Sequence, residues 1–152
     1  MEKLLIVIDM QDNFLYHADP LRQKEIRELK LNIIDLIKVF MVNSWPIILV
    51  EYNGNEKTCQ EILDTVNGYH KLHKVYKDDC DGSEEIIETI EEFGLPNSLN
   101  ICGVYSDECV FQTKEGLKEY DSIKYVIHKD CVWPFLEENE VHGRSVDKLA
   151  LV

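Results

Sequence analysis

The sequence predicts an α/β fold in three layers, with a mostly parallel β-sheet and helices on both of its faces. Short apolar runs alternate with stretches in which apolar residues recur every three or four positions. Uniformly apolar runs are typical of parallel strands buried on both faces, and the spaced stretches are typical of amphipathic helices. This alternation implies right-handed crossover connections, which place parallel strands between two helical layers.

The first half of the chain is expected to contain three strands and two helices, in the order strand 4–8, helix 21–42, strand 47–50, short helix 62–66 and strand 72–76. The first strand is followed directly by Asp9, and the third strand leads to Lys77. Both polar side chains therefore stand at the carboxyl ends of their strands. In an open parallel sheet these ends share one edge, where ligands bind.

The second half continues the alternation, with helix 83–93, strand 99–102, helix 109–120, strand 123–127 and a final helix over 137–151. Gly103 ends the fourth apolar run, and a short polar stretch then leads to Cys109. This pattern predicts a strand, a tight turn and a helix whose first turn carries the thiol. Unpaired N–H groups at a helix start carry partial positive charge and favour a thiolate.

Length, composition and charge exclude several classes of function. The 152 residues are expected to form one domain over 1–152, and the formal charge of −13 disfavours nucleic acid and anionic membranes as partners. No apolar stretch approaches the ~20 residues that span a bilayer, so a cytoplasmic location is expected. The five cysteines are odd in number and form no C-x-x-C pair, which favours reduced thiols.

Three reactive side chains are expected to converge at the carboxyl edge of the sheet. Cys109 would be a nucleophile, Asp9 the base that takes its proton, and Lys77 the cation that holds the negative charge. Backbone N–H groups in the turn before the cysteine could stabilise an oxyanion. The acidic neighbours Asp107 and Glu108 act against a thiolate, because like charges raise the pKa of a thiol.

Each of these residues also has a purely structural interpretation. A single cysteine after a strand is commonly a buried packing residue, an aspartate there is commonly a turn residue, and a loop lysine is commonly solvated. Cys102 and Cys131 are expected in the core, and His128 is expected to be a hydrogen-bonded structural histidine. No glycine-rich phosphate-binding motif follows a strand, so no nucleotide cofactor is expected.

Two motifs resemble those of the isochorismatase-like cysteine hydrolases, the family that includes nicotinamidases. Residues 8–14, Ile-Asp-Met-Gln-Asp-Asn-Phe, look like the D-x-Q-x-x-F opening of that family. Residues 103–110, Gly-Val-Tyr-Ser-Asp-Glu-Cys-Val, resemble its nucleophile turn. Lys77 with residues 80–83 is similar to its lysine loop, and residues 126–131 look like its last strand, so the resemblance covers nearly the whole chain.

The resemblance implies a triad of Asp9, Lys77 and Cys109 on a Rossmann-like sheet with strand order 3-2-1-4-5-6. It also implies a cis peptide between Val104 and Tyr105, with the N–H groups of Tyr105 and Cys109 directed at the oxyanion. The implied reaction is attack of the cysteine on an amide carbonyl, followed by hydrolysis of the thioester. The candidate substrate-binding residues are Gln11, Phe14, Tyr105 and Trp133.

The sequence departs from the metal-dependent members of the family. Those members carry histidine ligands after the second strand, where this chain has Glu51-Tyr52-Asn53. His70 and His73 lack a clear carboxylate partner, so no metal site is predicted. We therefore expect a metal-independent cysteine hydrolase that acts on a small amide-like molecule, either as a monomer or as a homo-oligomer. The alternatives are a catalytically idle binding or assembly module and a redox-responsive thiol protein.

Overall fold

The computed structural model describes residues 2–94, 96–120 and 122–143. Strands and helices alternate along the chain in the order β1 Lys3–Ile8, α1 Asp12–Leu15, α2 Pro20–Val42, β2 Ile47–Tyr52, α3 Gln60–Val66, β3 Leu72–Lys77, α4 Ser83–Phe93, β4 Ser98–Val104, α5 Cys109–Leu117, β5 Tyr125–Trp133 and β6 Glu140–His142. None of the helices in these ranges is both long and apolar enough to cross a membrane.

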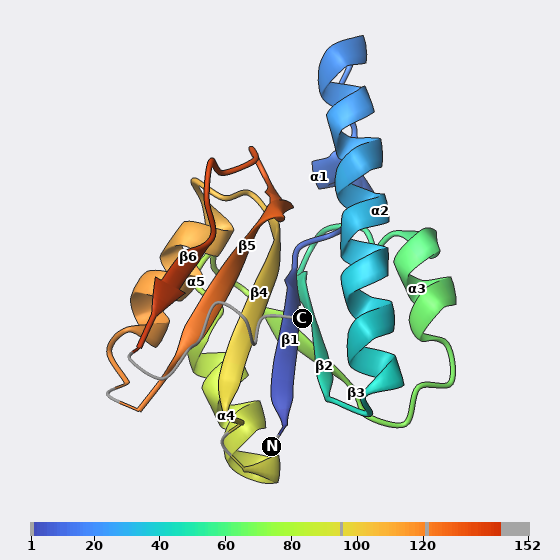
Figure 1. Ribbon diagram of the computed structural model, residues 1–152. Helices are drawn as coiled ribbons and strands as arrows, with labels where there is room; N and C mark the ends of the chain where they lie inside the picture. Colours follow the sequence, from blue (N-terminus) through green and yellow to red (C-terminus); the bar gives the residue numbers. More distant parts are fainter. Residues whose placement is uncertain (1, 95, 121, 144–152) are drawn as a thin grey trace.

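The strands form one six-stranded sheet in the order β3-β2-β1-β4-β5-β6, as the resemblance implied. Strands β1 to β5 are parallel to their neighbours, and only β6 runs antiparallel, beside β5 (Figure 1). β1 lies between β2 and β4, so its apolar residues are covered on both sides and on both faces. The residue that follows β1 is consequently placed near the middle of the carboxyl edge.

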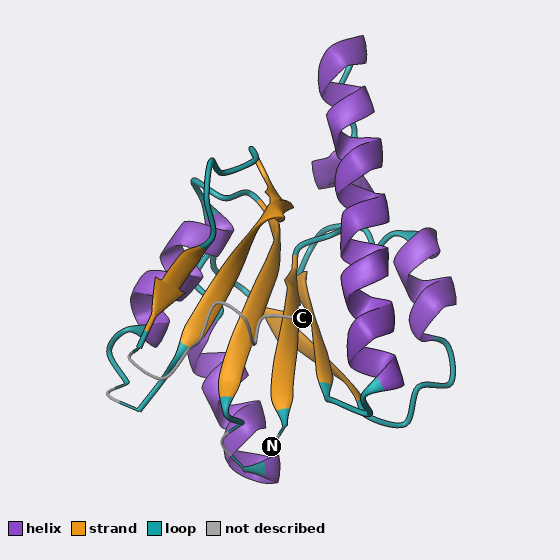
Figure 2. Cartoon of the chain, in the orientation of Figure 1, coloured by secondary structure: helices purple, strands orange, loops and turns teal. Residues whose placement is uncertain are grey.

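Helices cover both faces of the sheet, which confirms the predicted three-layer class. Helices α2 and α3 lie on one face, and α4 and α5 lie on the other (Figure 2). Alternate residues of β1 enter the two resulting cores: Leu4 and Ile6 face α4 and α5, whereas Leu5 and Val7 face α2 and α3. This two-sided burial explains why residues 4–8 of β1 are all apolar.

Helix α2 extends beyond the sheet at the carboxyl edge (Figure 1). It begins at Pro20, and the carboxylate of Asp19 accepts a hydrogen bond of 3.0 Å from the N–H of Leu21. Proline suits the first helical position because its missing N–H would have no partner there, and the aspartate caps the helix. The projecting turns place Arg22 above the edge where the candidate site lies.

The structure corrects two predictions in the last third of the chain. The strand expected over 123–127 is β5, which continues to Trp133 with a register shift opposite Ile101 and Gly103. The helix expected over 137–151 is wrong in its described part, because Glu140–His142 form the edge strand β6. Residues 144–151 of that expected helix lie outside the described ranges.

Candidate active site

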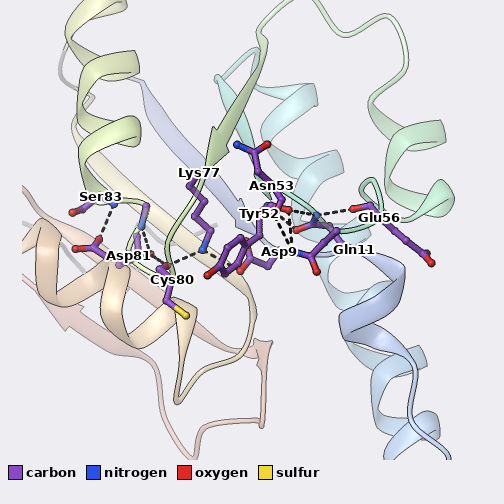
Figure 3. A network of polar contacts seen from close by, with 12 residues as sticks. Asp9, Gln11, Tyr52, Asn53, Glu56, Lys77, Cys80, Asp81 and Ser83 are labelled. Atoms are coloured by element: carbon purple, nitrogen blue, oxygen red, sulfur yellow. Dashed lines mark hydrogen bonds and ion pairs between the residues drawn. The ribbon is translucent and has the colours of Figure 1, made fainter.

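The three side chains predicted to react lie together at the carboxyl edge of the sheet. Asp9 follows β1, Lys77 is the last residue of β3, and Cys109 is the first residue of α5. Figure 3 shows the ammonium group of Lys77 turned toward Asp9, with Tyr52 and Cys80 beside it. Cys109 is 8 % exposed, and the other two residues are 1 % exposed. The lysine is therefore an interior residue and not a solvated loop residue.

A buried ion pair joins Lys77 to Asp9. Its Nζ lies 3.0 Å from Oδ2 of the carboxylate, and the two side chains are 0 % and 2 % exposed. The ammonium also donates a hydrogen bond of 2.7 Å to the carbonyl oxygen of Cys80 and lies 4.9 Å from the ring centre of Tyr52. These contacts offset the cost of removing a cation from water.

Gly103 lets strand β4 approach β1 closely enough to hold Asp9 in place. Its φ is +120°, and a Cβ atom at this position would overlap the carbonyl oxygen of Ile8. Asp9 itself has a φ of +54°, which is uncommon for a residue with a side chain. Glycine is thus required beside a turn that sends the carboxylate across the sheet edge.

Helix α5 is tied to the loop that follows Lys77. The buried hydroxyl of Thr113, one turn after Cys109, accepts a hydrogen bond of 3.1 Å from the N–H of Gly82 and donates one of 3.3 Å to the carbonyl oxygen of Cys80. A Cβ atom at Gly116 would overlap Oγ of Ser83, so a larger residue here would displace that side chain. The helix and the lysine loop therefore position each other.

Burial and the neighbouring carboxylate keep the thiol of Cys109 protonated. Burial raises its pKa most, the Asp9 carboxylate and the Cys80 thiol raise it further, and Lys77 acts in the opposite direction, leaving the pKa well above its usual range. This corrects the expectation that the helix start and the lysine would hold a thiolate at rest. The dominant carboxylate is Asp9 and not Asp107 or Glu108.

The carboxyl group of Asp9 is placed to accept the proton of the thiol. Burial raises the pKa of Asp9, whereas Lys77 and Cys109 lower it. Apart from Lys77 and the thiol of Cys109, its two oxygens have no hydrogen-bond partner in the part of the chain that the structure describes. A buried carboxylate with open acceptor positions beside a thiol can serve as a general base.

Two backbone N–H groups of the nucleophile turn have no backbone acceptor among the residues that the structure describes. Neither Tyr105 nor Cys109 donates a backbone hydrogen bond to any residue within the described ranges. The carbonyl oxygen of Tyr105 accepts from the N–H groups of Glu108 and Val110 at 3.0 and 3.1 Å, which closes the turn. The peptide bond between Val104 and Tyr105 is cis.

A cavity of about 390 Å³ lies beside the nucleophile turn, lined by His17, Arg22, Tyr105, Asp107, Glu108, Trp133 and Pro134. We call it the Trp133 cavity. Two of the four predicted substrate-binding residues, Tyr105 and Trp133, line it. Phe14 does not, because its ring packs 6.2 Å from that of Tyr52 and its carbonyl oxygen accepts the hydroxyl of Tyr105.

Sequence reasoning missed His17 and Arg22, which enter the cavity from the segment between α1 and α2 and from the first turn of α2. Neither belongs to a motif with recognisable spacing. The available signal was the length of the expected helix: a helix over 21–42, observed as the 23 residues of α2, is longer than the strands it covers and must project past their ends.

Gln11 holds a loop and does not face the cavity. Its side-chain nitrogen donates to the carbonyl oxygens of Tyr52 and Glu56 at 3.0 and 2.6 Å, and its side-chain oxygen accepts from the N–H of Tyr52 at 2.9 Å. Gln11 is 1 % exposed. These hydrogen bonds correct its predicted substrate-binding role to that of a positioning residue for residues 52–56.

Glu51 of β2 and His73 of β3 are both engaged in contacts with other side chains of the protein. The carboxylate of Glu51 accepts from both the N–H and the hydroxyl of Thr58 at 2.8 Å, and His73 stacks on Phe93 with ring centres 4.7 Å apart. Within residues 2–143, apart from the two undescribed positions, no three His, Cys, Asp or Glu side chains gather in a geometry suited to a metal ion.

The comparisons with known proteins agree with this architecture. A family model described as the isochorismatase domain matches residues 3–150. Solved structures that resemble the chain include N-carbamoylsarcosine amidase from Thermoplasma acidophilum (17 % identity, 87 % of this chain and 84 % of that chain, TM-score 0.69). Another is a nicotinamidase from Staphylococcus aureus (18 % identity, 86 % and 82 %, TM-score 0.70).

A third is an isochorismatase from Pseudomonas putida (20 % identity, 92 % and 77 %, TM-score 0.70). At these identities the structural likeness establishes the fold. A search of curated proteins found no match.

Proposed function

Because this chain belongs to the isochorismatase domain family, we propose that it hydrolyses a carbon–nitrogen bond of a small amide through a thioester on Cys109. The observation that carries the proposal is the buried pair of Asp9 and Lys77, 3.0 Å apart, next to the thiol. The likeness to an amidase and to a nicotinamidase supports an amide-like substrate.

The first step forms the thioester. As Sγ of Cys109 attacks the carbonyl carbon, the thiol proton passes to the carboxylate of Asp9. The carbonyl oxygen becomes an oxyanion, and the free N–H groups of Tyr105 and Cys109 are placed to donate to it. Asp9 then returns the proton to the leaving nitrogen, the carbon–nitrogen bond breaks, and ammonia or an amine departs.

The second step releases the acid. A water molecule gives a proton to the Asp9 carboxylate as its oxygen attacks the thioester carbon, and the carbon–sulfur bond breaks. The proton returns to sulfur, which regenerates the thiol. Lys77 keeps the carboxylate charged between transfers, because its ammonium lowers the pKa of Asp9. The sum of the two steps consumes one water per amide.

The redox alternative has less support than hydrolysis. Susceptibility of a cysteine to oxidation follows its thiolate character. Burial and Asp9 raise the pKa of Cys109, so the resting thiol is protonated at neutral pH. A nucleophile that is deprotonated only as it attacks suits hydrolysis with a built-in base better than it suits sensing of an oxidant.

The test compares ammonia release by the wild type and by Cys109→Ala over a panel of small primary amides. Cys131→Ala is the matched control, since Cys131 is 7 % exposed and lies in the core across the sheet. We expect activity to vanish in Cys109→Ala and to survive in Cys131→Ala. Intact-mass measurement during turnover should detect one acyl group on Cys109. Equal activity in the two variants would refute the proposal.

A further inference from the structure

The Trp133 cavity combines aromatic walls with an excess of negative charge. Its charged lining residues are two acids, Asp107 and Glu108, and one base, Arg22. From this arrangement we propose that the cavity receives a cationic group, so that the preferred substrates are amides that also carry an ammonium. The inference rests on the proposed function and names the substrate class of that site.

The two acids of the cavity are uncompensated, whereas the base is paired. Asp107 and Glu108 are exposed, and neither forms an ion pair with any residue placed in the structure. The guanidinium of Arg22 lies 3.8 Å from the carboxylate of Asp19, outside the cavity lining. An incoming carboxylate would thus meet two anions and a single cation, Arg22, whose contact with Asp19 is exposed and weak.

The aromatic walls also favour a cation. The rings of Tyr105 and Trp133 meet edge to face at 61° with centres 5.8 Å apart, and the ring of His17 lies 4.9 Å from that of Trp133. The faces of aromatic rings carry partial negative charge and attract an ammonium. Burial raises the pKa of Tyr105, and the charges of Glu108 and Asp107 raise it further, which indicates negative potential at this wall.

The cavity is continuous in sequence with the reacting groups. Glu108 immediately precedes Cys109, and Tyr105 supplies one of the two candidate oxyanion N–H groups. Cys109 itself does not line the cavity, so the proposed substrate must reach from the thiol past Glu108 to the carboxylates. Asp107 and Glu108 would then act on the far end of the substrate, whereas Asp9 acts on the thiol.

Three amides of equal length test the inference: 4-aminobutanamide, which is cationic, pentanamide, which is neutral, and 4-carbamoylbutanoate, which is anionic. We expect kcat/KM to decrease in that order, with at least about tenfold between the cation and the anion. The difference should shrink as salt is raised beyond about 0.15 M, because the carboxylates are exposed. Dividing each kcat/KM by the value for pentanamide corrects for any change in catalysis that does not depend on the charge of the substrate.

The double variant Asp107→Asn/Glu108→Gln should reduce the cation-to-anion ratio to about one. The matched control is Glu91→Gln/Glu92→Gln, which removes the same formal charge from exposed positions on α4. A ratio that falls equally in both variants would assign the preference to the net charge of the protein. A preference for the anion that disappears in Arg22→Gln would assign the cavity to carboxylates. Either result overturns the inference.

A binding measurement separates this inference from the proposed function. The chain has two tryptophans, so Trp45→Phe leaves Trp133 as the only one. In that variant we expect butylammonium to quench the fluorescence at lower concentration than pentanoate, and the Asp107/Glu108 changes to abolish the difference. Selective quenching without ammonia release would refute hydrolysis and keep the cation site. Ammonia release without selective quenching would support hydrolysis and refute the cation site.

Discussion

Replacing Lys77 with methionine should destabilise the protein strongly, because it leaves the charge of Asp9 buried without its partner. The ion pair is 3.0 Å long and its side chains are 0 % and 2 % exposed, so water cannot replace the ammonium. Removing one member of a buried pair costs about 3–5 kcal/mol. A domain of this size is stable by about 5–15 kcal/mol, so the variant should still fold and unfold at lower urea concentration.

The assay is urea unfolding followed by far-UV circular dichroism. The matched control is Lys30→Met, whose ion pair with Glu61 is 2.9 Å long but has side chains 19 % and 52 % exposed and should contribute no more than about 1 kcal/mol. The double variant Asp9→Asn/Lys77→Met should recover most of the loss, because no buried charge remains. If Lys77→Met costs no more than Lys30→Met, the reasoning is refuted.

The cost of Lys77→Met should also depend on pH. Lys77 lowers the pKa of Asp9 and burial raises it, so without the lysine the folded-state pKa rises further above the unfolded value. A group with a raised folded-state pKa loses stability as pH rises through that pKa. The deficit of the variant should therefore be largest at neutral pH and should shrink on acidification, as Asp9 becomes neutral.

Two further predictions concern residues outside the ion pair. Thr113→Val should cost about 1–3 kcal/mol in urea unfolding and lower kcat/KM for ammonia release, because the N–H of Gly82 loses its acceptor and the lysine loop loosens, whereas Thr113→Ser should restore both. Burial and Lys3 lower the pKa of His128 to about 4, so stability should fall by up to about 3 kcal/mol as pH drops from 6.5 toward 4. His128→Gln should make the urea midpoint less dependent on pH over that range, and an unchanged dependence would contradict the assignment.

The central part of the fold could be predicted because its strands are buried on both faces, and such burial leaves a continuous apolar run in the local sequence. Strands β1, β2 and β4 are mostly apolar on both faces, and the apolar stripe of α2 is long, so no competing interpretation arises for these elements. The carboxyl edge then follows from topology alone. Because all three residues lie at this edge, the sequence alone predicts that Asp9, Lys77 and Cys109 are close together.

The errors lie where tertiary contacts outweigh local pattern. Residues 128–131 of β5 include the exposed Lys129 and Asp130, which read as a turn, yet they belong to a strand whose register shifts beside β4. Strand β6 has three residues and owes its conformation to pairing with β5. No sequence period can reveal a segment so short.

The site itself could be predicted by residue type but not by charge state. The pKa of Cys109 depends on which carboxylate lies closest, and Asp107 is nearer than Asp9 in sequence only. Gln11 shows the same limit, since its polar side chain suits a substrate or a loop equally well until the positions of Tyr52 and Glu56 are known. The protonation state of Cys109 and the role of Gln11 both depend on distances between residues across the sheet edge, which the composition of the sequence does not reveal.

The central position of β1 sets the order in which this protein can become functional during synthesis. Asp9 leaves the ribosome well before Cys109, and β4, the strand beside β1 on one side, begins only at Ser98, which pairs with Lys3. Long-range parallel pairing of this kind is slow, because the entropy of loop closure is lost before the new contacts stabilise the chain. A nascent chain that ends before Cys109 therefore carries the proposed base and cation without the proposed nucleophile, and the edge of β1 stays unpaired until β4 emerges.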